Sequence, residues 1–433
     1  MQLGKSSARK TKPRRRWLTA QKEGSAMTTL SRSLRGAVLA IIATVSGNGM
    51  SAGISDGEIR VALMTDMENV MSDLAGQGSV IAAQMAIEDF GGHINGHRIR
   101  LFPVSHNSDG ELAISQIQDL HSRKNIDVIA DMVMADTAIP LQGFAARNAI
   151  LALHSGSDAS TLTGANCSRT GIHWGQDTYA LASGIVQASG GIPTKWFFVT
   201  ADTYSGHNLE RDARARLEAA DNTVLDVTRH RFGTQDFGEY ILAARNSQAD
   251  FIALASSGAD ARHAIRELYE HDSDAPRQAT LVGLSLSILD IRQLGLYIAQ
   301  NLLITTDYYW DQNEASRAWA NRFLQRHGTM PTHVHAAVYS SLTHYFKAVE
   351  AAGTDDALAV ARQMRAMPVN DFFANNGYIR EDGRLVRDIY LTRVKRPSQS
   401  RHAWDYLEII DTISGEFAFR PLTDSDCPLL SME

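Results

Sequence analysis

Short apolar runs alternate with stretches of helical period along this chain, and the alternation occurs twice. The first series of predicted strands comprises residues 58–64, 98–104, 126–129 and 150–153. The predicted helices between them are 79–90, 112–120 and 138–148. Because parallel strands need long crossover connections, which are usually helices, this order predicts a parallel sheet covered on both faces.

The alternation then restarts with the same layout, which predicts a second sheet unit. Its predicted strands are 196–199, 224–227, 250–254 and 280–282, and its predicted helices are 179–188, 207–220, 237–245 and 260–270. Predicted helices at 313–327, 332–352 and 355–366 and predicted strands at 378–379, 389–394 and 407–413 close the chain. The fold class is therefore α/β, and a length of 433 residues fits two sheet units better than one.

Charge is unevenly distributed. The formal net charge is −6, but residues 1–52 contain ten Lys or Arg and a single acidic residue. The remaining chain holds 32 basic and 47 acidic residues. Nucleic-acid binding needs clustered Lys and Arg, so this acidic body argues against a nucleic-acid partner.

The N-terminal segment has the features of an export signal. Arg32 and Arg35 precede an apolar run at 36–45, and small residues follow up to Ala52. This order is typical of a secretory signal peptide, and a run of about ten residues is too short to span a bilayer. Residues 1–26 carry eight Lys or Arg without an apolar period, and we expect translation to start at Met27.

The chain contains two cysteines, Cys167 and Cys427. In an exported protein such a pair predicts a disulfide, here closing a loop of about 260 residues that would pin the C-terminal tail. The alternative is two unrelated thiols.

Motifs for enzyme chemistry and metal binding are weak. Residues 76–78 lack the third glycine of a dinucleotide-binding loop, and the chain has neither a phosphate-loop motif nor a Gly-x-Ser-x-Gly elbow. His333 and His335 are two residues apart, not the four that helical zinc sites use. We therefore expect no enzymatic activity, no cofactor and no metal site.

Several short motifs, in their order and spacing, carry a family resemblance. They lie at residues 61–67 (VALMTDM), 76–79 (GQGS), 86–92 (AIEDFGG), 200–206 (TADTYSG), 307–311 (DYYWD) and 348–353 (AVEAAG). Over residues 58–420 the chain resembles the branched-chain amino-acid (leucine) type of ABC-transporter solute-binding proteins. Within it, the chain is most similar to a subgroup that takes aromatic carboxylates as well as amino acids.

The resemblance implies a type I periplasmic-binding fold, with two doubly wound parallel-sheet lobes joined by a three-strand hinge. We expect the crossovers near 172–178, 303–308 and 368–376. Residues 1–52 form the extension and signal peptide; lobe 1 comprises 53–173 and 306–370; lobe 2 comprises 177–303 and 376–415; and 416–433 form a tail. In open parallel sheets, ligands bind beyond the carboxyl ends of the strands, so the cleft between the lobes is the expected site.

The resemblance also implies which residues bind the ligand. In lobe 1 they are Ala135, Asp136, Thr137, Ser155, Gly156, Ser157 and Asp158, and in lobe 2 they are Tyr204, Ser256, Ser257 and Ser285. The loop 154–158 is expected to receive a ligand carboxylate, because hydroxyls and free N–H groups at a helix start donate to an anion. Asp136, Asp158 and Glu68 depart from the family pattern: they either contact a cationic or amide ligand group, or cap helices.

Aromatic side chains near the expected hinge and cleft have two interpretations. They are Trp174, Tyr179, Tyr204, Tyr308, Tyr309 and Trp310. Flat rings can sandwich a ligand, or they can pack the hinge. We expect two of the six to touch ligand, with Tyr204 the first choice.

The expected function is capture of a small amino-acid-like or aromatic carboxylate ligand in the periplasm. Delivery to an ABC permease in the inner membrane would follow closure of the lobes about the hinge. We expect a monomer. The alternative is a ligand-sensing protein, for amides or amino acids, without a transport role.

Overall fold

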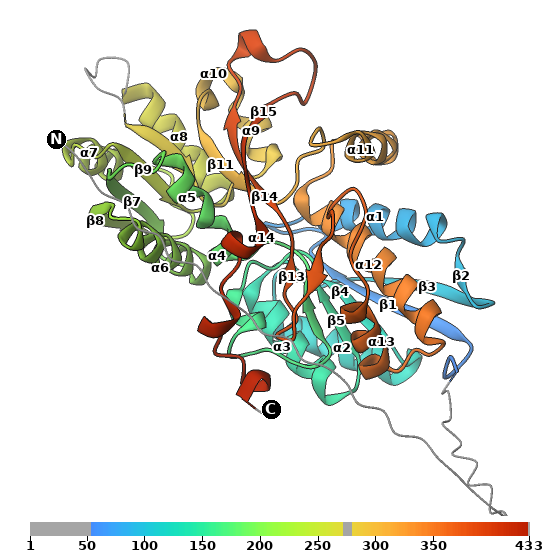
Figure 1. Ribbon diagram of the computed structural model, residues 1–433. Coiled ribbons are helices and arrows are strands. Elements are labelled where there is room, and N and C mark those ends of the chain that lie inside the picture. Colours follow the sequence, from blue (N-terminus) through green and yellow to red (C-terminus); the bar gives the residue numbers. More distant parts are fainter. Residues whose placement is uncertain (1–52, 272–278, 432–433) are drawn as a thin grey trace, which may run out of the picture. The chain divides into compact units, whose positions relative to one another are not determined.

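The computed structural model describes residues 53–271 and 279–431. The predicted signal peptide and the Met27 start lie outside these residues. The described residues all belong to one compact unit, and two large sheets organise it (Figure 1).

The first sheet has six strands in the order β2-β3-β1-β4-β5-β6. Their bounds are His93–Ile94 for β2, His97–Ser105 for β3, Glu58–Thr65 for β1, Val128–Asp131 for β4, Leu151–His154 for β5 and Gly171–His173 for β6. All pairings are parallel except that of β2 with β3, a hairpin that turns at Asn95-Gly96, where both residues have positive φ. The central strands β4 and β5 are buried along their whole length, as expected of strands covered on both faces.

Helices cover both faces of the first sheet. They are α1 (Gly76–Asp89), α2 (Gly110–Lys124), α3 (Ala135–Arg147), α11 (Glu314–His327), α12 (His333–Ala352) and α13 (Ala357–Ala366), with a 3-10 turn at Ser160–Thr163. Local sequence signals set their ends. Asp109 caps α2 by accepting from the N–H groups of Glu111 and Leu112, and α12 ends at Gly353, whose φ is positive. In Figure 1, α12 lies alongside α1, and the Tyr339 hydroxyl of α12 donates to Asp89 of α1 at 2.7 Å.

The second sheet has seven strands in the order β15-β14-β11-β10-β9-β7-β8. Their bounds are Leu407–Ile413 for β15, Ile389–Val394 for β14, Leu303–Thr306 for β11, Thr280–Gly283 for β10, Phe251–Ala255 for β9, Lys195–Ala201 for β7 and Thr223–His230 for β8. Strands β7 to β11 are parallel, whereas β14 runs antiparallel to both β11 and β15. Both large sheets are thus mainly parallel, as predicted, with antiparallel strands at their edges.

The helices of the second sheet follow the predicted alternation, although the prediction omitted the three helices at 288–294, 296–299 and 415–418 and joined two short helices into one. They are α4 (Thr178–Leu181), α5 (Ser183–Ala188), α6 (Tyr204–Ala219), α7 (Gly238–Asn246), α8 (Gly258–His271), α9 (Ile288–Leu294), α10 (Leu296–Ala299) and α14 (Gly415–Ala418). The single helix predicted at 179–188 is two short helices that meet at Ala182. A separate two-stranded ribbon pairs β12 (Tyr378–Ile379) with β13 (Leu385–Val386).

Three stretches of chain between the sheets contact one another. The N–H of His173, at the end of β6, donates to the Gly383 carbonyl at 2.9 Å. The Asp307 N–H, just after β11, donates to the side chain of Gln176 at 3.1 Å. The third stretch thus lies at about residues 383–388, beyond the predicted 368–376, because Arg384 and Arg387 carry its contacts to the first two.

Buried ion pairs hold this junction together. Arg387 donates to the Asp307 carboxylate at 2.5 Å, with both side chains almost fully buried, and its guanidinium lies 3.6 Å from the centre of the Phe373 ring. Arg384 pairs with Asp177 at 3.3 Å and covers the Phe419 ring. These contacts join all three connecting stretches in a solvent-excluded environment.

The C-terminal tail forms a fourth connection. Ala418 and Phe419 pack on the second sheet's core, and Arg216 of α6 donates to the Phe417 and Ala418 carbonyls. Beyond them, Cys427 forms a disulfide with Cys167, which lies between β5 and β6 of the first sheet. The predicted disulfide is therefore confirmed.

Candidate functional site

Two loops of the first sheet lie side by side at its carboxyl edge. Strands β4 and β5 pair in parallel, with Asp131 opposite His154, so the loops that follow them are neighbours. The first loop leads into α3, whose first three residues are Ala135, Asp136 and Thr137. The second loop carries the predicted residues 155–158. The topology thus brings the two lobe 1 groups together, as parallel strands require.

Three loops of the second sheet share one edge in the same way. Strand β9 pairs with both β7 and β10, all in parallel. Tyr204 follows β7 at the first position of α6, Ser256 and Ser257 follow β9, and Ser285 follows β10. The predicted lobe 2 residues therefore lie on adjacent loops.

Residues of the two edges meet directly at one place. The Ser205 hydroxyl donates to the Asp158 carboxylate at 2.9 Å, and the hydroxyls of Thr161 and Tyr204 lie 3.1 Å apart. Burial raises the pKa of Asp158, and the hydrogen bond from Ser205 partly opposes this rise. Asp158 therefore makes an inter-sheet contact, and neither Thr161 nor Ser205 was singled out from the sequence.

The hydroxyls of the loop 155–158 have protein partners. Ser155 lies 3.1 Å, oxygen to oxygen, from Ser341 of α12, and the Ser157 hydroxyl accepts from the Ala159 N–H at 3.3 Å. Both side chains are buried. Gly156 is closely packed, because a Cβ there would lie 3.0 Å from a carboxylate oxygen of Asp131 and from the Val133 Cα, so any larger residue would require its neighbours to shift.

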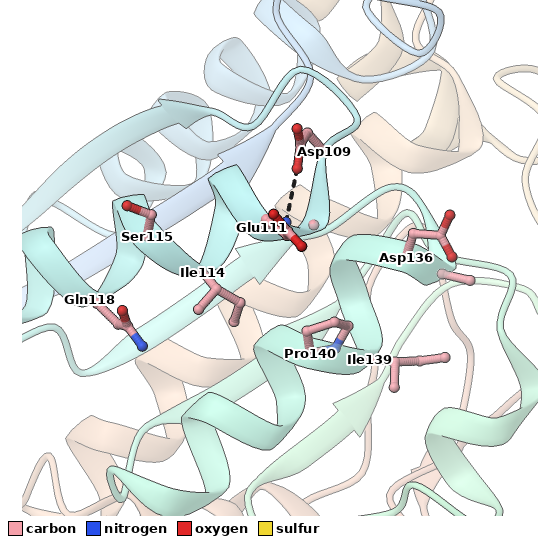
Figure 2. A pocket seen from close by; sticks show the side chains of 10 residues that line it. Asp109, Glu111, Ile114, Ser115, Gln118, Asp136, Ile139 and Pro140 are labelled. Carbon is pink, nitrogen blue, oxygen red and sulfur yellow. Dashed lines mark hydrogen bonds between the residues drawn. The ribbon is translucent and has the colours of Figure 1, made fainter.

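Asp136 and Thr137 differ in their surroundings. Thr137 is buried and its hydroxyl donates to the Met134 carbonyl at 2.9 Å. Asp136 is exposed and, with Ala135, lines a groove of about 720 Å³ between α2 and α3 (Figure 2). Its carboxylate has no hydrogen bond or ion pair to any residue in 53–271 or 279–431, so helix capping does not account for it.

The remaining lobe 2 residues are polar and accessible to different degrees. Ser256 is buried, and its hydroxyl has no hydrogen-bond partner among the described residues. Ser257 is exposed and Ser285 is partly exposed. The Tyr204 ring is 41% exposed, so among the six aromatic residues it is the one most available to a ligand.

The other five aromatic side chains pack into the protein. Trp174 donates to Ser340, and both Tyr309 and Trp310 donate to the Trp404 carbonyl. Tyr308 is buried against other rings, and Tyr179 lies under the Arg216 guanidinium at 4.1 Å. Their positions favour the packing interpretation.

Two buried acids beside the site were missed from the sequence. Asp66, after β1, accepts from the N–H groups of Asn69 and Met71 and from the Ser108 hydroxyl, and these bonds lower its pKa against the effect of burial. It organises the loop that carries Glu68, whose own N–H also points to Asp66 at 3.4 Å. The sequence did contain a signal for Asp66, because this acidic residue directly follows a strand and precedes a turn.

The second acid, Asp131, has no such support. It ends β4 with a φ of 77°, is fully buried, and neither carboxylate oxygen has a hydrogen-bond partner among the described residues. Burial raises its pKa to about 7, and the nearby hydroxyls of Ser79 and Thr65 oppose that rise without reaching hydrogen-bonding geometry. A neutral carboxyl thus lies behind Gly156 at moderately acidic pH.

The histidine pair has a structural role. His335 accepts from the Thr332 N–H and lies 2.9 Å from the Ala75 carbonyl, and burial lowers its pKa to about 3. Within residues 53–271 and 279–431, no group of three or more His, Cys, Asp or Glu side chains is arranged to hold a metal ion. In the same residues, every helix is too short or too polar to cross a membrane.

Two parallel-sheet units whose ligand-side edges meet define a class of two-lobed binding protein. Residues 58–401 match the model of the periplasmic binding protein family. The chain belongs to this family.

Solved structures agree with this membership. A periplasmic binding protein from Burkholderia mallei is 36% identical, with a TM-score of 0.80 over 86% of this chain and 99% of that one. A branched-chain amino-acid ABC transporter ligand-binding protein from Burkholderia xenovorans is 32% identical, with a TM-score of 0.81 over 86% of this chain and 100% of that one. The predicted type I periplasmic-binding fold is confirmed.

A more distant structure shares the fold alone. It is a Rhodopseudomonas palustris ABC-transporter solute-binding protein in complex with benzoate, 16% identical, with a TM-score of 0.70 over 83% of this chain and 97% of that one. The curated proteins contain no match to this chain. The family is described as periplasmic binding proteins, and the Burkholderia xenovorans and Rhodopseudomonas palustris neighbours are described as binding proteins of ABC transporters.

Proposed function

We propose that this protein is exported to the periplasm, captures a small amino-acid-like or aromatic carboxylate solute between its two lobes, and delivers it to an ABC importer. The observation that carries the proposal is the meeting of the two carboxyl edges at Asp158–Ser205 and Thr161–Tyr204. The segment that follows β5 meets the segment that follows β7 there, and the carboxyl edges of parallel sheets are where such sheets bind ligands. The names of the Burkholderia and Rhodopseudomonas proteins support these two solute classes.

The proposed ligand residues are those named from the sequence, with different roles. Ser256, Ser257 and Ser285 offer hydroxyls from lobe 2, and the Tyr204 ring offers a flat apolar face. Closure of the lobes on a solute is favoured only by contacts that the solute makes in the closed state.

A thermal-shift screen of the purified protein tests the proposal. The panel contains branched-chain amino acids, benzoate and hydroxybenzoates, and short amides. A solute at one hundred times its dissociation constant adds about 2.7 kcal/mol to the free energy of unfolding, which gives a measurable rise in Tm. A rise with aromatic acids or amino acids is expected. Amides alone would favour the sensing alternative, and no rise with any compound would contradict the proposal.

The Tyr204 ring provides a matched test of the site. We expect Tyr204→Ala to weaken binding of the solute found in the screen by about tenfold or more, because an aromatic ring contributes a large contact area. Tyr297→Ala, which removes an exposed tyrosine of α10, is the control and should leave the dissociation constant unchanged. Equal effects of both substitutions in calorimetric titrations would place the solute elsewhere.

A further inference from the structure

His173 joins a connecting stretch between the lobes to the loop that follows β5. It is the last residue of β6, and its main-chain N–H donates to the Gly383 carbonyl of the third connecting stretch at 2.9 Å. The Nε2 atom of its ring lies 2.7 Å from the Ser157 carbonyl oxygen. The backbone of one residue is thus bonded to a connecting stretch, and its side chain is bonded to a proposed solute loop.

The surroundings of the ring determine which nitrogen carries the proton. Burial and the charge of Arg384 hold the pKa of His173 well below its usual range, so the imidazole is neutral. A carbonyl oxygen only accepts hydrogen bonds, so Nε2 is the protonated nitrogen and donates to Ser157. The other nitrogen, Nδ1, is then a bare acceptor, and it has no hydrogen-bond partner among the described residues.

Core packing alone does not explain a histidine at this position. The side chain of His173 is almost fully buried, and a buried nitrogen without a partner costs stability. An apolar ring of similar size would avoid that cost. The hydrogen bond to Ser157 is what the imidazole supplies and an apolar ring cannot.

This hydrogen bond orients the peptide group between Ser157 and Asp158. In a planar trans peptide the C=O and N–H groups point in opposite directions, so a carbonyl turned toward His173 turns the Asp158 N–H away from it. Burial raises the pKa of Asp158, whereas Ser205 and the residue's own N–H oppose that rise, so this N–H faces the carboxylate. The same carboxylate accepts from Ser205 of the second lobe at 2.9 Å. The orientation of one peptide group therefore sets a contact between the two sheet edges.

The far end of the same segment is held by a different residue. Gln142 of α3 donates to the Leu162 carbonyl at 3.0 Å and also to the Asn166 carbonyl. The disulfide fixes the residue that follows Asn166. Loss of the His173 hydrogen bond would therefore free the Ser157 peptide without releasing the rest of the segment.

We propose that His173 is a positioning residue of the solute site, which holds the Ser157–Asp158 peptide in the orientation that lets the lobes close on a solute. The inference rests on the proposed function. A loop that is already held in its bound geometry costs less to order when a solute binds, so this hydrogen bond raises affinity without contacting the solute. The bond from His173 to Gly383 ties that orientation to the connecting stretches about which the lobes close.

Three variants test this role in calorimetric titrations with L-leucine and with 4-hydroxybenzoate. His173→Phe keeps a ring but removes the donor, and we expect it to raise the dissociation constant about fivefold, the value of one hydrogen bond. His173→Gln carries an amide N–H at a similar reach and should return the constant to within about twofold of wild type. His344→Phe is the matched control, because His344 is also buried and its Nε2 lies 3.0 Å from the Met364 carbonyl. This control should lower Tm and leave the dissociation constant unchanged.

Nitrogen-15 NMR of the wild type supplies a readout that needs neither a solute nor a folded variant. At pH 6 the His173 ring should be neutral, with its proton on Nε2. A charged ring, or a proton on Nδ1, would overturn the proposal.

The titrations separate this role from the function on which it rests. An unchanged dissociation constant in His173→Phe, an equal rise in His344→Phe, or no recovery in His173→Gln would refute the positioning role alone. If the wild type binds neither probe and no other compound of the thermal-shift panel, the proposed function itself is refuted, and the role of His173 with it.

Discussion

At the scale of single residues, the ion pair of Arg387 and Asp307 joins two of the three connecting stretches. It is almost fully excluded from water, where an unpaired charge is costly. We predict that Arg387→Met lowers the free energy of unfolding by about 3–5 kcal/mol, the range for removing one partner of a buried pair. Urea unfolding monitored by circular dichroism measures this.

A surface pair and a double variant check that interpretation. Arg317 and Asp311 pair in a partly exposed position, so Arg317→Met should cost less than about 1 kcal/mol. The double variant Asp307→Asn, Arg387→Met should cost less than the sum of its single substitutions, because it leaves no unpaired charge. Additive losses would show that the two residues act separately.

Asp131 makes stability depend on pH with a definite sign. Its pKa is about 7 in the folded protein and about 3.9 in an unfolded chain, so between these values the folded state binds more protons. Its contribution to stability is therefore present at low pH and is lost as the pH rises toward 7, by up to about 1.4 kcal/mol per pH unit. We predict that Asp131→Asn unfolds at a higher Tm than wild type above pH 7 and at a similar Tm at pH 4.

Asp66 is the control with the opposite sign. Its hydrogen bonds lower its pKa, so its stabilisation is present at neutral pH and is lost as the pH falls through the lowered value. Asp66→Asn should therefore destabilise the protein at pH 7. If Asp131→Asn and Asp66→Asn shift Tm in the same direction at pH 8, the surroundings of the two carboxyl groups do not have opposite effects on their pKa values.

The sequence predicted which loops of the fold carry the candidate site residues, but it did not predict the contacts that their side chains make. Parallel pairing alone places the loops after β4 and β5 side by side, so that part follows from the order of elements. The outward position of Asp136 and the contact of Asp158 with Ser205 depend on side-chain packing and tertiary approach. No local sequence signal encodes these.

At the scale of elements, apolar periodicity was sufficient for the long helices and central strands. It missed β2, β6 and β11, which are two to four residues long, because so short a run shows no period. It merged α4 and α5, since the break between them is the single residue Ala182, which leaves the apolar pattern continuous. The position of the third connecting stretch depended on long-range partners of Arg384 and Arg387, which sequence spacing does not reveal.

The tail is joined to the rest of the protein by its disulfide and by the packing of Phe419 on the core of the second sheet. We predict that the double variant Cys167→Ser, Cys427→Ser loses about 2–5 kcal/mol of unfolding free energy, because the closed loop spans 260 residues. Hydrogen exchange should rise in residues 415–431 and stay unchanged in β7. A loss below about 1 kcal/mol would show that packing alone holds the tail.

At the scale of the whole molecule, polar contacts between the sheet edges set how readily the lobes stay together. Ser205→Ala removes a hydrogen bond to Asp158 that is worth about 1 kcal/mol. If solute is held only when the lobes meet, this substitution should weaken solute binding about fivefold. Ser247→Ala, which removes a hydroxyl bond within α7 and its flank, is the control for isothermal titration.

The disulfide also determines what a protease can release. Because Cys167 and Cys427 are covalently joined, a single cut at any peptide bond between them leaves both products attached to each other. The second sheet lies wholly within that ring, so a nicked molecule would run as an intact chain on a gel without reductant and as two fragments with it. In an environment rich in proteases, the ring lets the protein survive cleavage of an exposed loop without losing half of its binding site.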